Sequence, residues 1–181
     1  MLLSSYNNFS KLKIYDIQNY INFKPLKKDF NKLINKKPYV LHICYTEGKY
    51  MKVNNEKKIE PIITNKNERV LCELLNVFTD LAEIPEDKVI QLQMQRVIGP
   101  TKVQEWYSEN GKTVGIIIAD EKNTTGGVHE FKQGEGAFLR KKLMQGNLVI
   151  FDDTSLKYRV TPLFSFDKDI MGYKDIISLI C

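Results

Sequence analysis

Few side chains in this sequence have the chemistry of catalysis or metal binding. The chain contains two histidines, His42 and His129, and three cysteines. A metal site would need both histidines together with Glu105 or Glu130, and the two histidines are far apart in the sequence. A single histidine on a strand is more often a hydrogen-bonded structural residue. The histidines therefore predict structural roles more strongly than a metal site.

The cysteines favour core packing over reactivity. His42 and Cys44 would face the same side of a strand, because residues two apart do so, and a Cys–His pair can be drawn from them. Their neighbours are apolar, which favours a buried, inert thiol. Cys72 and Cys181 complete an odd set without zinc-site spacing, so we expect free thiols. The sequence shows no P-loop and no nucleophile elbow.

Length and charge limit the class of protein. A chain of 181 residues suits a single domain, residues 1–181, with a substantial core. The net charge of +5 comes largely from lysines scattered over the first sixty residues, and arginine is scarce. This pattern predicts a solvated basic surface and no nucleic-acid partner. No apolar stretch has the length of a membrane span, and the start of the chain lacks a secretory signal, so we expect a cytoplasmic protein with no membrane partner.

The first half of the chain mixes helix and strand patterns. Apolar residues at three- and four-residue spacings predict a helix over residues 67–82, which Pro85 ends. Runs rich in β-branched and aromatic residues predict strands over 39–45 and 49–53 around a turn at Glu47–Gly48. The remaining N-terminal predictions are a helix, or a helix and turn, over 9–23 and a helical turn over 29–36.

The second half is predicted to be β structure. Short strands alternate with turn signals such as Asn110–Gly111, which is typical of a sandwich or barrel. The candidate strands are residues 89–97, 112–119, 127–132, 147–151, 157–164 and 174–180. We therefore expect an α+β domain. Helices and flanking strands over residues 1–84 would pack outside a double-stranded β-helix (jelly-roll, cupin-like) core over residues 85–181.

The last thirty residues resemble a known family. The segment Asp152–Asp153 runs through Tyr158 and Val160–Thr161–Pro162 to Gly172–Tyr173–Lys174–Asp175. It is similar to the closing segment of the bacterial 2-oxoglutarate/Fe(II)-dependent dioxygenases, which include free amino-acid hydroxylases such as L-isoleucine dioxygenase. In that family the paired aspartates lead to a metal-binding histidine, and Tyr158 stands in its place here.

The resemblance implies that the other iron ligands are also substituted. The family places a Pro-Glu-Gly-x-His-x-Asp-Gly element after a strand that resembles Gln91–Val97. Here the corresponding residues are Pro100–Tyr107, so Gln104 takes the histidine position and Trp106 the aspartate position. An amide is a poor replacement for imidazole, and indole has no free lone pair in its ring plane. The Tyr158 phenol, with an ordinary pKa of about 10, would have to lose its proton. We therefore expect no cofactor. Fe(II) and 2-oxoglutarate are expected only if the protein is an active oxygenase.

The resemblance also implies a ligand pocket. Lys174 stands where the family has an arginine, which is the expected partner of the distal carboxylate of 2-oxoglutarate. Lysine keeps the positive charge but cannot form the two parallel hydrogen bonds of a guanidinium group. The residues predicted to line this pocket are Arg96, Gln104, Trp106, Tyr158 and Lys174. In one interpretation the pocket holds a small amino acid or carboxylate. In the other, Trp106 and Tyr158 plug the cavity as core residues.

Three functional hypotheses follow. The leading one is a relative without standard hydroxylase activity that binds a small amino-acid or carboxylate ligand or a protein partner. The alternative is an active amino-acid-modifying enzyme, either an oxygenase with relocated ligands or one with metal-independent chemistry in the same pocket. The third is an accessory subunit that acts through an interface, including that of a homodimer.

Overall fold

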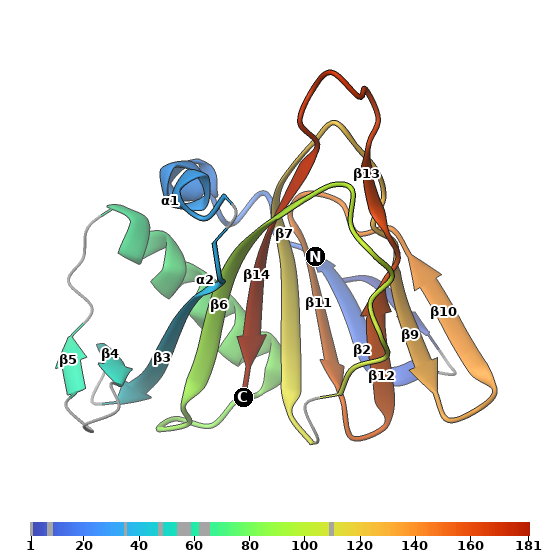
Figure 1. The fold of residues 1–181 in the computed structure, drawn as a ribbon. Coiled ribbons are helices and arrows are strands. Elements are labelled where there is room, and N and C mark those ends of the chain that lie inside the picture. The colour runs from blue at the N-terminus through green and yellow to red at the C-terminus, as the bar shows by residue number, and fades with distance from the viewer. Residues whose placement is uncertain are drawn as a thin grey trace.

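The structure, a computed structural model, describes residues 2–6, 9–34, 36–46, 49–53, 59–61, 66–108 and 111–181. Strands dominate these ranges, and their helices lie only in the first half of the chain (Figure 1). The elements in chain order are β1 (Leu2–Tyr6), β2 (Phe9–Asp16), η1 (Lys24–Leu26), α1 (Lys27–Lys32), β3 (Tyr39–Thr46), β4 (Lys49–Val53), β5 (Ile59–Pro61), α2 (Lys66–Ala82), β6 (Ile90–Ile98), β7 (Thr113–Lys122), β8 (Thr124–Gly126), β9 (His129–Gln133), β10 (Ala137–Lys141), β11 (Asn147–Asp152), β12 (Leu156–Val160), β13 (Leu163–Ser165) and β14 (Tyr173–Ile180).

The strands form a large and a small antiparallel sheet. The large sheet has nine strands in the order β1-β2-β11-β7-β14-β6-β3-β4-β5, and the small sheet has three in the order β10-β9-β12. Strands β8 and β13 pair separately at one end of the molecule (Figure 1). Strands from the first 84 residues and from the rest of the chain share the large sheet. Two facing antiparallel sheets of this kind give a jelly-roll-like fold.

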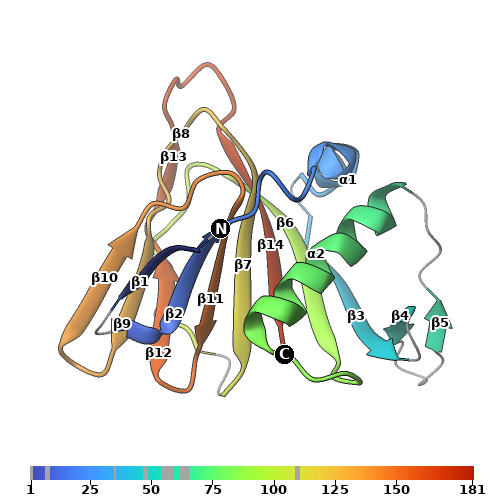
Figure 2. The same ribbon diagram turned by 180° about the vertical axis from the view of Figure 1, so that it is seen from behind.

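The two sheets pack face to face over the β2, β11 and β7 side of the large sheet. Their shared core consists of buried apolar side chains from both sheets, including Leu12, Ile14, Ile116, Phe131, Val149, Phe151 and Leu156. On the opposite face of the large sheet a second core is covered by η1, α1 and α2 (Figure 2). The molecule is therefore built in three layers: helices, large sheet and small sheet.

Helix α2 packs closely on strand β7. Its buried face carries Leu74, Leu75 and Phe78, as the three- and four-residue spacing predicts. Gly115 of β7 makes the close approach feasible, because a Cβ there would lie 2.7 Å from a Phe78 ring carbon. None of the helices in the described ranges has the length and apolar character that crossing a bilayer requires.

The structure corrects the helix predicted over residues 9–23. Residues Phe9–Asp16 form strand β2, which lies between β1 and β11. Leu12 and Ile14 face the small sheet, whereas Tyr15 and Ile17 belong to the core under the helices. Each face of β2 carries both buried and exposed residues, so the simple alternation of a half-exposed strand is lost, and the mixture resembles a helical pattern.

Most other element predictions are close to the structure. The helix over 67–82 and the strands over 39–45, 49–53, 89–97, 112–119, 147–151 and 174–180 are present with small shifts at their ends. The strand predicted over 157–164 is divided between β12 and β13, and strand β10 was not predicted. The turn at Glu47–Gly48 and residue Asn110 of the second predicted turn lie outside the described residues.

Candidate functional site

Two of the predicted pocket residues, Gln104 and Tyr158, meet between the sheets. Tyr107 and Tyr158 exchange backbone hydrogen bonds of 2.8 and 2.9 Å, which fixes the segment 101–107 against the edge of β12. Gln104 and Tyr158 then line a small pocket of about 210 Å³. Its other walls carry apolar and neutral polar side chains, including Ile116 and Ser178, and one carboxylate, Asp153, whose Oδ1 accepts from the backbone amides of Gly111 and Lys112.

Trp106 lies on the opposite, outer face of the small sheet. The guanidinium of Arg159 lies 4.3 Å from the centre of the indole, and the ring of Phe138 packs edge-on at 5.9 Å. Arg159 is the neighbour of Tyr158 on β12, and adjacent strand residues face opposite sides. The structure therefore separates Trp106 from Gln104 and Tyr158.

Arg96 lies on the helix side of the large sheet. Its guanidinium forms a bidentate pair with Asp175 on β14, with both nitrogen–oxygen distances at 2.6 Å. It also donates to Asn31 of α1 and stacks 4.0 Å from the ring of Tyr173. Burial raises the pKa of Asp175, and the hydrogen bonds from Arg96 oppose that shift. Asp175 and Lys174 are neighbours on β14 and face opposite sides, so Arg96 and Lys174 are not brought together.

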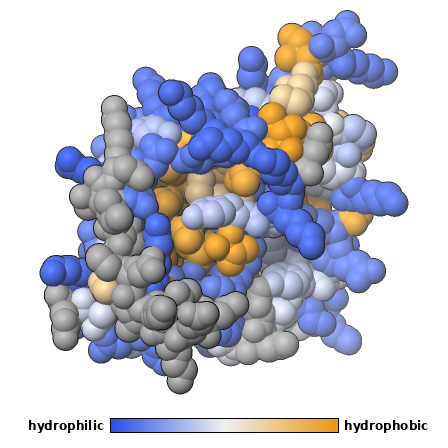
Figure 3. Space-filling view, turned by 60° about the vertical axis from the view of Figure 1, so that its left-hand side comes forward, coloured by the Kyte–Doolittle hydropathy of each residue, from blue (hydrophilic) through white to orange (hydrophobic). Residues whose placement is uncertain are grey.

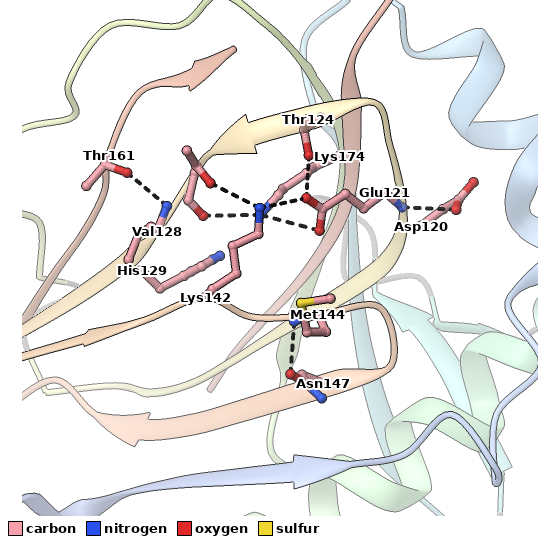
Figure 4. Close-up of polar contacts among 12 residues, drawn as sticks. Asp120, Glu121, Thr124, Val128, His129, Lys142, Met144, Asn147, Thr161 and Lys174 are labelled. Atoms are coloured by element: carbon pink, nitrogen blue, oxygen red, sulfur yellow. Dashed lines mark hydrogen bonds and ion pairs between the residues drawn. The ribbon is translucent and has the colours of Figure 1, made fainter. Parts of the chain in front are cut away.

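Lys174 belongs to a buried cluster of charges between the sheets (Figure 4). Its side chain is 2% exposed, and its Nζ donates to the Gly127 carbonyl at 3.1 Å and lies 3.6 Å from a Glu121 oxygen. Lys142 lies 3.1 Å from the other Glu121 oxygen, which also accepts from Thr124. Burial lowers the pKa of Lys174, and Glu121 partly offsets this effect. The buried ammonium group of Lys174 and the partly exposed one of Lys142 thus share one carboxylate.

The Gly126–Gly127 turn gives Lys174 its place. Gly127 has a φ of +56°, which favours glycine, and a Cβ there would lie 3.2 Å from the Lys174 Nζ. Both glycine carbonyls point at the cluster, since Lys142 reaches the Gly126 carbonyl at 3.4 Å. A side chain at Gly127 would force the ammonium away from its carbonyl partner.

His129 links this cluster to Tyr158. The imidazole is fully buried, and its Nδ1 lies 2.9 Å from the Tyr158 hydroxyl oxygen. Burial lowers the pKa of His129 to about 3, with further contributions from Lys174 and Lys142, so the ring is neutral. Its Nε2 is buried and has no hydrogen-bond partner among the described residues. Figure 4 shows this nitrogen directed toward the two lysines.

Tyr158 keeps its phenolic proton. Burial raises its pKa well above the ordinary value, so the hydroxyl is neutral at physiological pH. When this hydroxyl donates to the Nδ1 of His129, the proton of the neutral imidazole lies on Nε2, which becomes an unpaired buried donor. Such a group costs free energy unless a water or ligand accepts from it.

The residues at the predicted metal positions do not suit Fe(II). They offer a neutral amide at Gln104 and a neutral phenol at Tyr158, while the Trp106 indole faces away. An oxygenase iron site uses two imidazoles and a carboxylate. Over the described ranges, no group of three or more His, Cys, Asp or Glu side chains is placed to hold a metal ion. His42 contacts Gln91 at 3.3 Å on another part of the large sheet and does not extend the His129 cluster.

Sequence reasoning missed two members of the cluster, Glu121 and Lys142. It treated His129 as a structural histidine and did not connect it to Tyr158. One signal was present: Asp120 and Glu121 directly follow the apolar run of β7, where charges entering a core need partners. Nothing in the sequence showed that Lys142 would be one of those partners.

Comparisons with known proteins identify the fold. No family model and no curated protein sequence match this chain. Among solved structures, IDO from Bacillus thuringiensis superposes with a TM-score of 0.73 at 12% identity, covering 93% of this chain and 88% of the other. The Fe(II)/α-ketoglutarate-dependent dioxygenase TqaL gives 0.69 at 9% identity, with 93% and 81% covered. A 2OG-Fe(II) oxygenase family member from Burkholderia pseudomallei gives 0.57 at 7% identity, with 94% and 84% covered. Similarity at identities this low shows the fold alone. The chain therefore has the three-layered, jelly-roll-like fold of the 2-oxoglutarate/Fe(II) oxygenases.

Proposed function

We propose that this protein binds a small carboxylate-bearing molecule, such as an amino acid, between its sheets and does not hydroxylate by the Fe(II) mechanism. The observation that carries the proposal is the unpaired Nε2 of His129 beside two lysines that share one glutamate. With the imidazole proton on Nε2, a ligand carboxylate would accept from Nε2–H and from an ammonium group at the same time.

The charge of the cluster supports an anionic ligand. Lys142 and Lys174 supply two positive charges and Glu121 one negative charge, while His129 is neutral. The three charges therefore sum to one net positive charge. A monocarboxylate ligand would balance it. The Lys142 side chain is 36% exposed, so its ammonium group is accessible to an anion from solvent.

The side chains at the three predicted metal positions support the proposal that the protein does not use iron. Tyr158 would need to lose a proton that burial holds in place, and Trp106 would need to turn from the outer face of the small sheet to the inner one. Gln104 alone offers only a weak amide oxygen.

Titration calorimetry tests the ligand proposal. Acetate, glycine, succinate and 2-oxoglutarate are titrated at pH 7.5 into the full chain and into Lys174→Met, His129→Gln and Lys11→Met. At least one carboxylate should bind, and Lys174→Met should weaken it roughly tenfold or more, because hydrogen bonds to charged groups are worth about 1.5–3 kcal/mol. Lys11→Met removes an exposed lysine and should change nothing. No binding, or equal affinity for wild type and Lys174→Met, contradicts the proposal.

A second measurement tests the absence of hydroxylase chemistry. The protein is incubated anaerobically with Fe(II), its bound iron is counted, and succinate formation from 2-oxoglutarate is followed after oxygen is admitted. We expect substoichiometric iron and no succinate above a protein-free control. One iron per chain together with succinate formation would instead favour an active enzyme.

A further inference from the structure

A second hollow lies on the helix side of the large sheet, between α1, α2, β3 and β6. Its volume is about 560 Å³, within the roughly 300–1,000 Å³ typical of ligand sites. Its apolar floor is formed by Leu33, Leu41, Leu71 and Met94. Figure 3 shows an apolar area on this side of the molecule, with hydrophilic side chains above it and to its right. We call it the α1–α2 hollow.

Among the residues that the structure describes around the α1–α2 hollow, one lysine has no ion pair. Asp29 is held by Lys32 at 2.9 Å and by the Asn67 amide at 2.6 Å. Glu68 is held by Lys52 at 2.9 Å. Lys36 also lines the hollow, is exposed, and has no ion pair with any residue that the structure describes. The carboxylates of Asp29 and Glu68 are thus paired, and the ammonium group of Lys36 remains available beside the apolar floor.

We propose that the α1–α2 hollow binds an elongated apolar molecule with a single carboxylate head, such as a medium-chain fatty acid. The alkyl chain would lie on the partly exposed Leu33 and Leu41, above the buried Leu71 and Met94, and the carboxylate head would pair with Lys36. A small polar carboxylate would leave the floor exposed to water, and a cationic amphiphile would be repelled by Lys36. This site is separate from the interior cluster of Lys174, which lies on the other face of the large sheet.

The size of the apolar floor predicts a dependence on chain length. Each buried methylene contributes about 0.8 kcal/mol, which corresponds to roughly fourfold tighter binding. Hexanoate, octanoate and decanoate, kept below their micelle concentrations, should therefore bind in that order of rising affinity. The series should level off once the hollow is filled.

Three variants of the full chain test the proposal by titration calorimetry with decanoate and decanol. Lys36→Met should weaken decanoate about two- to fivefold, as expected for an exposed ion pair, and leave decanol unchanged. The matched control Lys28→Met, at an exposed position outside the hollow, should bind both like wild type. Leu41→Glu places a carboxylate on the floor and should abolish decanoate binding, with circular dichroism reporting whether the variant folds.

Several outcomes would overturn the proposal. No decanoate binding, no dependence on chain length, or equal loss of decanoate and decanol in Lys36→Met each contradict it. The chain-length series and Lys36→Met remain decisive even when Leu41→Glu does not fold. Lys174→Met should bind decanoate like wild type, and a loss there would place decanoate in the interior cluster instead of the hollow.

Discussion

Burial fixes the protonation of the residues between the two sheets. His129 is fully buried and neutral, and Tyr158 keeps its proton. In both cases burial disfavours the charged form, because water cannot solvate it there. Lys174 remains close to Glu121 and a backbone carbonyl, which compensate part of the cost of burying its ammonium group. The polar interior thus combines neutral hydrogen-bonding groups with a small number of paired charges.

The low pKa of His129 predicts a loss of stability in acid. Below its ordinary pKa of 6.5, the unfolded chain takes up a proton that the folded chain refuses until about pH 3. Stability should therefore fall as the pH drops from 6.5 toward 3, by about 1.4 kcal/mol per unit from this residue. Urea unfolding between pH 7 and 5 should show a shallower decline in His129→Gln than in wild type. His42→Gln, which removes an exposed imidazole, is the control, and equal slopes in all three proteins would contradict the assignment.

The Arg96–Asp175 pair predicts a large effect of removing one partner. Arg96→Met would leave a buried carboxylate without its bidentate partner, and we expect a loss of about 3–5 kcal/mol in the free energy of unfolding. Adding Asp175→Asn should recover part of that loss, because the uncompensated charge is then gone. Lys11→Met breaks an exposed pair with Asp152 and should cost less than about 1 kcal/mol. Denaturant titration measures all three, and a small effect of Arg96→Met would argue against a tightly buried pair.

At the scale of elements, the contact between α2 and β7 depends on the absence of one side chain. In Gly115→Ala the new methyl group would lie 2.7 Å from the Phe78 ring, so the helix or the ring must shift. We expect a loss of about 1–3 kcal/mol, typical of overpacking. Gly136→Ala is the matched control, because a Cβ there meets nothing within 4 Å.

A double-mutant cycle identifies the cause of that loss. Phe78→Leu removes the ring atoms that the new methyl group at position 115 would meet, so it should cost less in the Gly115→Ala background than in wild type. A coupling of at least about 0.5 kcal/mol is expected for residues in contact. Additive effects of the two substitutions would show that the clash is relieved elsewhere.

At the scale of the whole molecule, the oxygenase fold and an oxygenase metal site make separate demands on the sequence. The three-layered arrangement superposes on the dioxygenase TqaL with a TM-score of 0.69, while the predicted ligand positions carry Gln104, Trp106 and Tyr158 in place of two imidazoles and a carboxylate. The core positions need only apolar side chains of suitable size, whereas a metal site needs specific donors converging on one point.

This separation predicts that simple restoration of the ligands will fail. The triple variant Gln104→His, Trp106→Asp, Tyr158→His supplies the donor types, but position 106 faces the outer side of the small sheet. We expect a folded protein that does not bind Fe(II) stoichiometrically, as measured by iron content and circular dichroism. Stoichiometric iron in the triple variant would show that the segment 101–107 can turn its side chains inward.

The sequence determined much of the fold because local patterns carry it. The spacing of Leu71, Leu74 and Phe78 predicted α2, and β-branched runs between glycine turns predicted most strands of both sheets. The ending at Thr161–Pro162 and Gly172–Asp175 suggested the oxygenase architecture that the superpositions support. These signals need only neighbours a few residues apart.

Only the tertiary structure decided which side chains share a space. Residues 9–16 became a strand because β1 and β11 pair with it, and Arg96 and Trp106 face away from Tyr158 because strand register assigns their sides. The partnership of His129 with Tyr158 and the two lysines joins segments distant in sequence. Such contacts depend on long-range pairing, in which a shift of one residue turns every side chain to the other face.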